Sequence, residues 1–238
     1  MYGMQEKVCL IIPCYNEAER LDISLFNTFS ENLYCLFVND GSTDDTEELI
    51  RNNLSNNIFL LSLEENFGKA EAVRRGMMHA MSLPFAEDID WIGYWDADLA
   101  TPLSEVPMFI RYAKNYETKI DAIWGSRIYR LGSDIKRSFR RHILGRLFTT
   151  AIAILLKVKS YDSQCGAKLF RPDIVDIAFR EPFISRWIFD VELLKRLPGH
   201  AVIEYPLGAW SDVGGSKMNL VREIPSIAID ILRIRLKY

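Results

Sequence analysis

The sequence predicts an α/β fold in which a mainly parallel central sheet is flanked by helices. Short apolar runs that suit buried strands alternate with segments of helical spacing as far as about residue 127, which is the pattern of βαβ units. Polar clusters follow the ends of these runs, where ligands bind in sheets of this kind. Hydrophobic residues make up 49% of the 238 residues, which is enough to bury a large core.

The strands are predicted from short apolar runs that end at a proline, a turn or a polar cluster. In chain order, the expected strands are residues 7–13, 34–39, 58–63, 91–95, 122–125, 165–170 and 202–205.

The helices are predicted from apolar residues three or four positions apart and from residues that cap helix ends. The first half is expected to contain helices at 17–29, 44–52, 69–81 and 103–115. After residue 127 a basic run, 136–146, precedes an apolar helix that ends near residue 156. Further helices are expected near 187–197 and at 224–236, and the last of these is amphipathic and basic.

Composition narrows the class of protein. The net charge of −3 gives no indication of a nucleic-acid partner. None of the four cysteines has the C-x-x-C spacing of a zinc site, so we expect reduced, buried thiols in a cytosolic protein. The first eight residues do not form a signal peptide. The longest apolar run, 147–156, is half of the ~20 residues that a membrane-spanning helix needs, so the chain is expected to be soluble or to lie on a membrane.

Acidic and basic side chains at the strand ends are the candidates for chemistry. Asp96 and Asp98 could share a divalent cation, and carboxylate oxygens suit Mg²⁺ or Mn²⁺ with phosphates completing the shell. Asp40 could accept hydrogen bonds from a uracil or a ribose, and Lys69 at a helix start could bind a phosphate. Each also has a plainer interpretation: a loop with two aspartates, an aspartate turn that caps a helix, and an exposed lysine.

Five motifs in order resemble the inverting GT-A glycosyltransferases of family 2, and the resemblance covers nearly the whole chain. These motifs are residues 12–17 (IPCYNE), 38–44 (VNDGSTD), 66–69 (NFGK), 96–98 (DAD) and 125–127 (GSR). In the second half, residues 162–170, 186–194 and 215–217 look like the dolichyl-phosphate β-glucosyltransferase branch, with dolichyl-phosphate mannose synthases more distant.

The resemblance implies a role for each matching residue. Pro13, Tyr15, Glu17 and Asp40 would line the nucleotide pocket, with Gly68 and Lys69 at the phosphates. Asp96 would contact the nucleotide or sugar, and Asp98 would hold the metal. Arg127 and Arg141 would grip the acceptor phosphate, with Gln164, Asp190 and Lys217 near the sugar and phosphates. Ala100 stands where the mannose enzymes tend to place a metal-binding glutamine, so a third protein ligand is not assigned.

The resemblance also suggests a division of the chain. Residues 1–219 would form the GT-A catalytic domain, with a nucleotide-sugar-binding half at 1–127 and an acceptor-binding half at 128–219. Residues 220–238 would form the amphipathic C-terminal helix.

The expected reaction is transfer of a hexose, glucose by resemblance, from a UDP-sugar to a polyprenyl phosphate. A phosphate monoester is mostly dianionic at pH 7 because its second pKa is ~6, so it needs no base. It needs cations instead, and residues 136–146 supply Lys136, Arg137, Arg140, Arg141 and Arg146. Two alternatives remain open: transfer to a saccharide hydroxyl with Asp190 or Glu192 as base, and a nucleotide-sugar-binding protein without catalysis.

The basic run could also face an anionic membrane surface, with the apolar stretch 144–156 lying in the interface. We therefore expect a peripheral protein on the cytoplasmic face of a membrane. A basic solvated face followed by a core helix is the alternative for residues 136–156. For the C-terminal helix, core packing or a homo-oligomer interface is an equal alternative.

Overall fold

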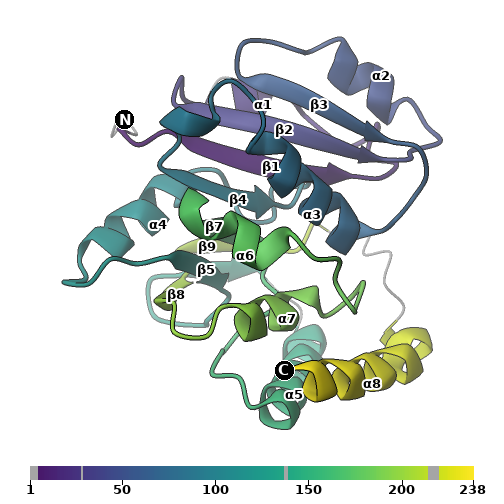
Figure 1. The fold of residues 1–238 in the computed structure, drawn as a ribbon, viewed down its shortest axis with the longest axis vertical. Coiled ribbons are helices and arrows are strands. Elements are labelled where there is room, and N and C mark those ends of the chain that lie inside the picture. Colours follow the sequence, from purple (N-terminus) through teal and green to yellow (C-terminus); the bar gives the residue numbers. More distant parts are fainter. Residues whose placement is uncertain (1–4, 28, 137–138, 214–219) are drawn as a thin grey trace.

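The structure is a computed structural model that describes residues 5–27, 29–136, 139–213 and 220–238. Within these residues, a seven-stranded sheet forms the centre of the molecule, in the order β3-β2-β1-β4-β7-β5-β8 (Figure 1). Its strands pair in parallel except β7, which is antiparallel to both β4 and β5. The strands are β1 (Val8–Cys14), β2 (Leu33–Asp40), β3 (Ile58–Leu63), β4 (Trp91–Trp95), β5 (Ala122–Ser126), β7 (Ala167–Phe170) and β8 (Val202–Pro206).

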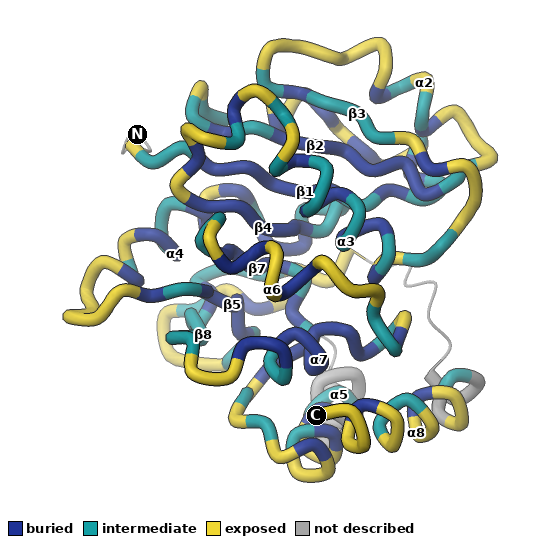
Figure 2. Tube along the Cα trace, in the orientation of Figure 1, coloured by how far each residue is buried: buried dark blue, intermediate teal, exposed yellow. Residues whose placement is uncertain are grey.

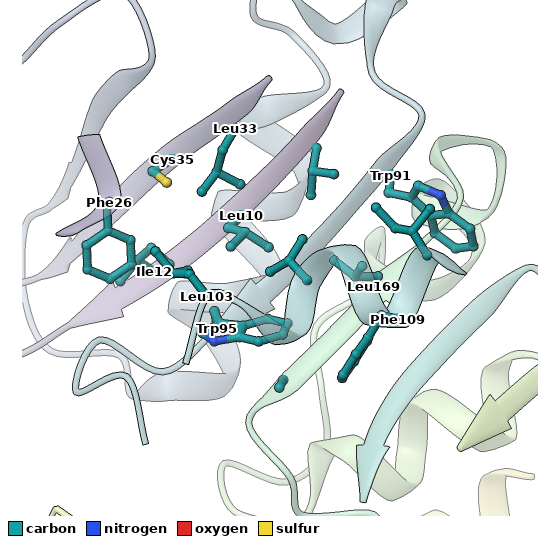
Figure 3. Close-up of a cluster of buried hydrophobic side chains, with 14 of the residues drawn as sticks. Leu10, Ile12, Phe26, Leu33, Cys35, Trp91, Trp95, Leu103, Phe109 and Leu169 are labelled. Carbon is teal, nitrogen blue, oxygen red and sulfur yellow. The ribbon is translucent and has the colours of Figure 1, made fainter. Parts of the chain in front are cut away.

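Helices cover both faces of this sheet. The α-helices of the described residues are α1 (Ser24–Asn27), α2 (Thr46–Arg51), α3 (Lys69–Ala80), α4 (Glu105–Lys114), α5 (Phe139–Leu156), α6 (Val175–Phe179), α7 (Phe189–Arg196) and α8 (Leu220–Lys237). One apolar cluster lies on the face that α4 covers, and Figure 3 shows part of it around Trp95 and Phe109. A second cluster lies on the opposite face, which α3, α6 and α7 cover. The central strands are buried along most of their length (Figure 2).

The α/β prediction is therefore confirmed, and each expected strand lies within two residues of an observed one at its start and its end. Gly76 shows how closely α3 packs on the sheet. A side chain at this position would collide with Ile11 of β1 and would come within 2.8 Å of Val38 of β2. The close approach fixes α3 against the sheet, and with it the position of Lys69 at the start of the helix.

The helix expected at 17–29 is wrong except for the single turn α1. Arg20 N and Leu21 N both donate to Glu17 O, which closes a single turn, and side chains of the 42–46 segment bind the backbone at its start: Asn16 N donates to Ser42 Oγ (3.0 Å) and Glu17 N to Thr46 Oγ1 (2.8 Å). Asn16 also has a positive φ of 53°. The segment is therefore a loop that crosses the end of the sheet and is held by residues 42–46.

Two features of the second half were not expected. A small parallel pair, β6 (Asp134–Lys136) with β9 (Ala209–Ser211), lies outside the main sheet. Residues 139–146 of the basic run share one helix, α5, with the apolar run, and α5 packs against α8. Figure 1 shows this pair at the opposite end of the molecule from β3. The buried cluster beneath this pair also includes the start of α7, and it consists of Ile152, Leu156, Ile188, Val191, Ile227 and Ile234.

None of the described helices is long and apolar enough to cross a membrane. The four cysteines are free and buried, as expected.

Candidate active site

The carboxyl ends of β1, β2, β4 and β5 lie at one edge of the sheet because these strands run parallel. We call this the carboxyl edge; it is formed by residues 13–20, 40–42, 66–69, 96–101 and 126–127. The motifs that the sequence singled out therefore meet at one place. The contacts below show how their side chains are arranged.

Asp40, at the end of β2, holds the loop before α3. Its Oδ1 accepts a hydrogen bond from Phe67 N (2.9 Å) and its Oδ2 accepts one from Gly68 N (2.8 Å). Desolvation raises the pKa of Asp40, although these two N–H groups act to lower it. Gly68 has a φ of 90°, and a Cβ there would come within 2.8 Å of the Arg186 guanidinium. Asp40 therefore positions the start of α3, in addition to any contact with a ligand.

Lys69, the first residue of α3, forms an ion pair with Asp96 at the end of β4. Desolvation acts to lower the pKa of Lys69, but the carboxylates of Asp96, Asp190 and Asp98 outweigh it, so the pKa lies above its ordinary value. The opposite side of Asp96 contacts Gly166, where an added Cβ would collide with the carboxylate. Asp96 is thus held between an ammonium group and a glycine, at a point where α3, β4 and the loop before β7 meet.

Asp98 lies in the turn after β4. The turn is closed by Leu99 N, which donates to Asp96 O (3.1 Å), and by the Trp95 indole N–H, which donates to Thr101 O (2.7 Å). Asp98 Oδ1 accepts a hydrogen bond from Ala100 N (3.0 Å). Desolvation and the charge of Asp96 raise the pKa of Asp98, against the opposing effects of Ala100 N–H, Lys69 and Arg20. Two carboxylates therefore repel each other here and leave a demand for positive charge.

Arg20 contributes to this charge balance. Its Nη2 donates to Glu17 Oε1 (2.6 Å), its Nε also contacts the Glu17 carboxylate, and its charge acts on Asp98. Glu17, which we expected in the nucleotide pocket, is mostly buried. The i,i+3 spacing of Glu17 and Arg20 was the signal in the sequence, and we did not expect Arg20 at the site.

The donor set fits a hard divalent cation that a ligand helps to hold. Asp96 and Asp98 supply carboxylate oxygens. Within the described residues, no group of three or more His, Cys, Asp or Glu side chains is arranged to hold a metal. A cation here would therefore take its remaining ligands from phosphate and water, which is how Mg²⁺ is commonly bound.

Asp190, near the start of α7, is joined to the sheet below the site. Its Oδ1 accepts a hydrogen bond from Lys168 Nζ (2.6 Å) and another from the Tyr94 hydroxyl. The charge of Asp190 also acts on Lys69, which places it near the Asp96 group. The sequence indicated Asp190 as a site residue but gave no role to Lys168. A lone lysine in the apolar strand AKLF was the signal, because a buried ammonium needs an anionic partner.

Arg127, after β5, is paired with Asp162. Its Nε and Nη2 each donate to the Asp162 carboxylate at 2.7 Å. The guanidinium also lies 5.4 Å from the centre of the Trp210 ring. Asp96 acts electrostatically on Arg127, which places the arginine within range of the carboxyl edge. Arg127 is thus near the site, with one side of its guanidinium bound to Asp162.

The other candidates fall into three groups. Pro13 pairs with Val38 in the sheet, and Tyr15 lies in the loop that follows β1. Gln164 lies in the loop before β7, and its side-chain N–H₂ is buried without a partner in the described part of the chain. Arg141 belongs to α5, but its side chain is outside the described residues, as is the whole of Lys217.

The side chains of Lys136 and Arg146, at the two ends of the basic run, are described and both have partners. Lys136 pairs with Asp134 (3.2 Å). Arg146 donates to the Tyr161 carbonyl and lies 3.5 Å from the centre of the Tyr161 ring. Arg146 thus joins α5 to the 160–162 loop, whose Asp162 holds Arg127.

The sequence matches the profile described as Glycosyl transferase family 2 over residues 9–177. It is 33% identical over 252 residues to a dolichyl-phosphate beta-glucosyltransferase of Trichomonas vaginalis, covering 98% of this chain and 74% of the relative. It is 31% identical to the dolichyl-phosphate beta-glucosyltransferase of Dictyostelium discoideum, covering 96% of this chain and 74% of the relative. The enzyme of that name from Saccharomyces cerevisiae is 30% identical, and the match covers 96% of this chain and 74% of that enzyme.

Solved structures support the fold. Glucosyl-3-phosphoglycerate synthase from Mycobacterium tuberculosis, in complex with Mn²⁺, uridine-diphosphate-glucose and phosphoglyceric acid, superposes with a TM-score of 0.66. The two sequences are 16% identical, and the match covers 98% of this chain and 79% of that one. A complex of the same synthase with Mg²⁺ and uridine-diphosphate has a TM-score of 0.62 at 18% identity. The match covers 98% of this chain and 79% of that one. The likeness confirms the GT-A fold.

Proposed function

The chain belongs to glycosyl transferase family 2 and is a glycosyltransferase, and from this premise we propose that it transfers a hexose from a UDP-sugar to a polyprenyl phosphate at a membrane surface. The sugar is glucose by the names of the relatives, which are dolichyl-phosphate beta-glucosyltransferases. The observation that carries the proposal is the contact of Lys69 with Asp96 beside Asp98 at the carboxyl edge. It gathers the charges that a nucleoside diphosphate and a cation need.

On the donor side, the diphosphate would lie against the start of α3, where Lys69 supplies a positive charge and Asp40 fixes the backbone. Asp98, with Asp96, would hold Mg²⁺ or Mn²⁺, and both ions occur with uridine diphosphate in the solved structures of the same fold. When bound, such an ion would neutralise charge on the leaving diphosphate. Pro13, Tyr15 and Glu17 are assigned to the nucleotide from their place at the same edge.

On the acceptor side, the protein needs to neutralise and orient an anion. A phosphate monoester with a second pKa of ~6 already presents an ionised oxygen at neutral pH. Arg127 keeps a guanidinium edge that Asp162 does not use, and a guanidinium suits phosphate oxygens. Attack opposite the leaving nucleotide would invert the anomeric centre. We assign residues 1–127 to the nucleotide-sugar and 128–219, with Arg141 and Lys217, to the acceptor and phosphates.

Transfer to a saccharide hydroxyl has less support because that reaction needs a base. Glu192 is fully buried, and its carboxylate accepts hydrogen bonds from Ile184 N (2.7 Å), Arg196 Nη2 (2.8 Å) and the Tyr238 hydroxyl (3.2 Å). It therefore anchors the 181–184 loop and the C-terminal helix. Glu192 does not fit the role of base.

Membrane contact is assigned to the helix pair α5 and α8. Apolar side chains remain exposed on both: Ile154 and Leu155 on α5, and Ile229, Leu232 and Leu236 on α8. Arg233, Arg235 and Lys237 accompany them on α8. An apolar surface with cations suits an anionic lipid surface, here the cytoplasmic face of a membrane. Self-association through this surface would appear instead as a dimer in solution.

The test is a transfer assay with purified protein, a panel of UDP- and GDP-sugars, a short-chain prenyl phosphate, and Mg²⁺ or Mn²⁺. We expect a lipid-linked hexose with UDP-glucose. Binding of a UDP-sugar by calorimetry, without a product from any prenyl phosphate, would refute the acceptor. A product with a free saccharide would support the alternative.

A further inference from the structure

Lys168 is a buried charge inside the sheet. It lies in β7, and its side chain has no exposed surface. Its ammonium donates three hydrogen bonds: to Ser163 O (2.9 Å), to Cys165 O (2.5 Å) and to Asp190 Oδ1 (2.6 Å). An ammonium has three N–H donors, so all of them are used. Burying such a group is costly unless it is paired, and Asp190 is the anion that pairs with it.

The partner carboxylate is held equally firmly. The side chain of Asp190 is 9% exposed, and its Oδ1 also accepts the hydrogen bond of the Tyr94 hydroxyl. Desolvation and the charge of Asp190 raise the pKa of Tyr94 well above its ordinary value, so this hydroxyl keeps its proton. One oxygen of Asp190 thus joins β4, β7 and α7.

Side chains from α3, β4, β5 and the loop before β7 also lie around the Lys168–Asp190 pair. Lys69 approaches Asp190 from α3. The Cys165 thiol lies beside Lys168, and desolvation raises its pKa to about 11, so it is neutral. The rings of Trp124 and Tyr94 lie 4.6 Å and 5.3 Å from Lys168 Nζ. A second ammonium on α3 and two aromatic rings therefore surround the Lys168–Asp190 pair.

The same ammonium sets the loop that carries Gln164. The two carbonyls that it binds belong to the residues on either side of Gln164. The amide N–H₂ of Gln164 is buried and has no partner in the described residues. A buried donor without a partner is costly, which indicates that it is kept for a ligand atom. Lys168 therefore fixes both Asp190 and Gln164 from beneath.

We propose that Lys168 is a positioning residue that locks Asp190 and Gln164 into one rigid unit facing the donor sugar. The ammonium joins the two because it binds the Asp190 carboxylate and the two carbonyls beside Gln164. The inference rests on the proposed function and adds to it the residue that holds these two side chains in place.

The test compares the wild type with Lys168→Met, Asp190→Asn and the double variant. In Lys168→Met, kcat should fall about 10²-fold because the two side chains lose their fixed geometry. The affinity for UDP, which lacks the sugar, should stay within about twofold by calorimetry. The proposal places Asp190 and Gln164 at the sugar, and changes at sites that share no contact act independently. The losses of kcat in Lys168→Met and Asp190→Asn should not add in the double variant, because residues that act as one unit are coupled. A merely structural role of Lys168, independent of Asp190, would give additive losses.

The double variant has no unpaired buried charge and is expected to fold even if Lys168→Met does not. Wild-type kcat in Lys168→Met or in the double variant would overturn the proposal, as would additive losses in the two single variants. The proposed function fails separately, if the wild type makes no product with prenyl phosphate. Calorimetry with UDP-glucose and UDP does not depend on that result, and Lys168→Met should bind UDP-glucose more weakly while its affinity for UDP stays the same.

Discussion

Asp162 binds Arg127 along one side of the guanidinium, through two side-chain hydrogen bonds of 2.7 Å and a third from the Arg127 backbone N–H (3.0 Å). The loop that carries Asp162 is itself fixed by Glu204 of β8, which accepts hydrogen bonds from Asp162 N (2.8 Å) and Tyr161 N (2.9 Å). This chain of contacts decides which edge of Arg127 can meet a ligand. It also ties Arg127 to the edge strand of the sheet.

The Arg127–Asp162 pair should make stability depend on acid pH. Desolvation acts to raise the pKa of Asp162, but Arg127 outweighs it, and the pKa falls to about 2. Because the pKa is depressed in the folded state, the contribution is complete above the unfolded value of ~4 and is lost as pH falls toward 2. Urea unfolding of the wild type should show a loss of about 2 kcal/mol over this window from the pair.

The control for that measurement is Arg127→Met/Asp162→Asn, which removes both charges together. Its unfolding free energy should lack this part of the pH dependence. Parallel pH curves for the wild type and the double variant would show that the pair does not contribute.

Substituting Asp98→Asn should remove most transfer activity and weaken metal binding. The carboxylate loses its charge but keeps an oxygen that can accept from Ala100 N. The turn should therefore persist, so the effect is on the cation and not on the fold. We expect kcat/KM to fall at least about 10²-fold, in line with losing a preorganised electrostatic contact. Mn²⁺ titration by calorimetry in the presence of UDP checks the metal, and full activity in the variant would exclude the role.

Substituting Gly166→Ala should displace Asp96 without unfolding the protein. The added Cβ would occupy the place of the Asp96 carboxylate, which would have to turn away from Lys69. We expect KM for the UDP-sugar to rise about tenfold or more, since one charged contact is worth roughly 1.5–3 kcal/mol. Asp96→Ala/Gly166→Ala serves as the matched comparison, because the collision is gone. If Gly166→Ala lowers activity further in the Asp96→Ala background, the glycine acts by another route.

The strands and the motifs at their ends could be predicted from the sequence because both depend on local patterns. The run Trp91–Trp95 is a buried strand by composition, and the two aspartates after it must then lie at its carboxyl end. The loop at 15–23 could not be predicted in this way. Its helical spacing was present, but the side chains of Ser42 and Thr46 bind its backbone from 26 and 29 residues away.

The partners of site residues were harder to predict for the same reason. Arg127 is 35 residues from Asp162, and Tyr94 is 96 residues from Asp190. The pairing follows from the antiparallel strand β7, which enters the sheet between β4 and β5 and brings Lys168 beneath the site. The order of strands in a sheet depends on long-range packing, and the apolar run 165–170 alone carries no such information.

The exposed apolar side of α8 should control contact with membranes. Leu232 is 60% exposed and Leu236 is 88% exposed, whereas Ile227 and Ile234 on the same helix are buried against α5 and α7. Leu232→Glu/Leu236→Glu should therefore leave the fold intact, while placing two anions where the lipid would lie. We expect at least a tenfold loss of binding to vesicles that contain anionic lipid, because each buried apolar side chain contributes roughly 1.5–3 kcal/mol. Activity on a water-soluble short-chain prenyl phosphate should remain, since neither residue touches the carboxyl edge.

Leu54→Glu is the matched control, because Leu54 is 47% exposed after α2, at the end of the molecule near β3. It replaces one exposed leucine by an anion, as each of the two substitutions in the α8 variant does, without touching the α5–α8 pair. Vesicle sedimentation should be normal for this variant and reduced for the α8 variant. Equal sedimentation of both variants and the wild type would exclude α8 as the lipid-binding surface. A shift from dimer to monomer in the α8 variant by analytical ultracentrifugation would instead identify the surface as a contact between two copies of the chain.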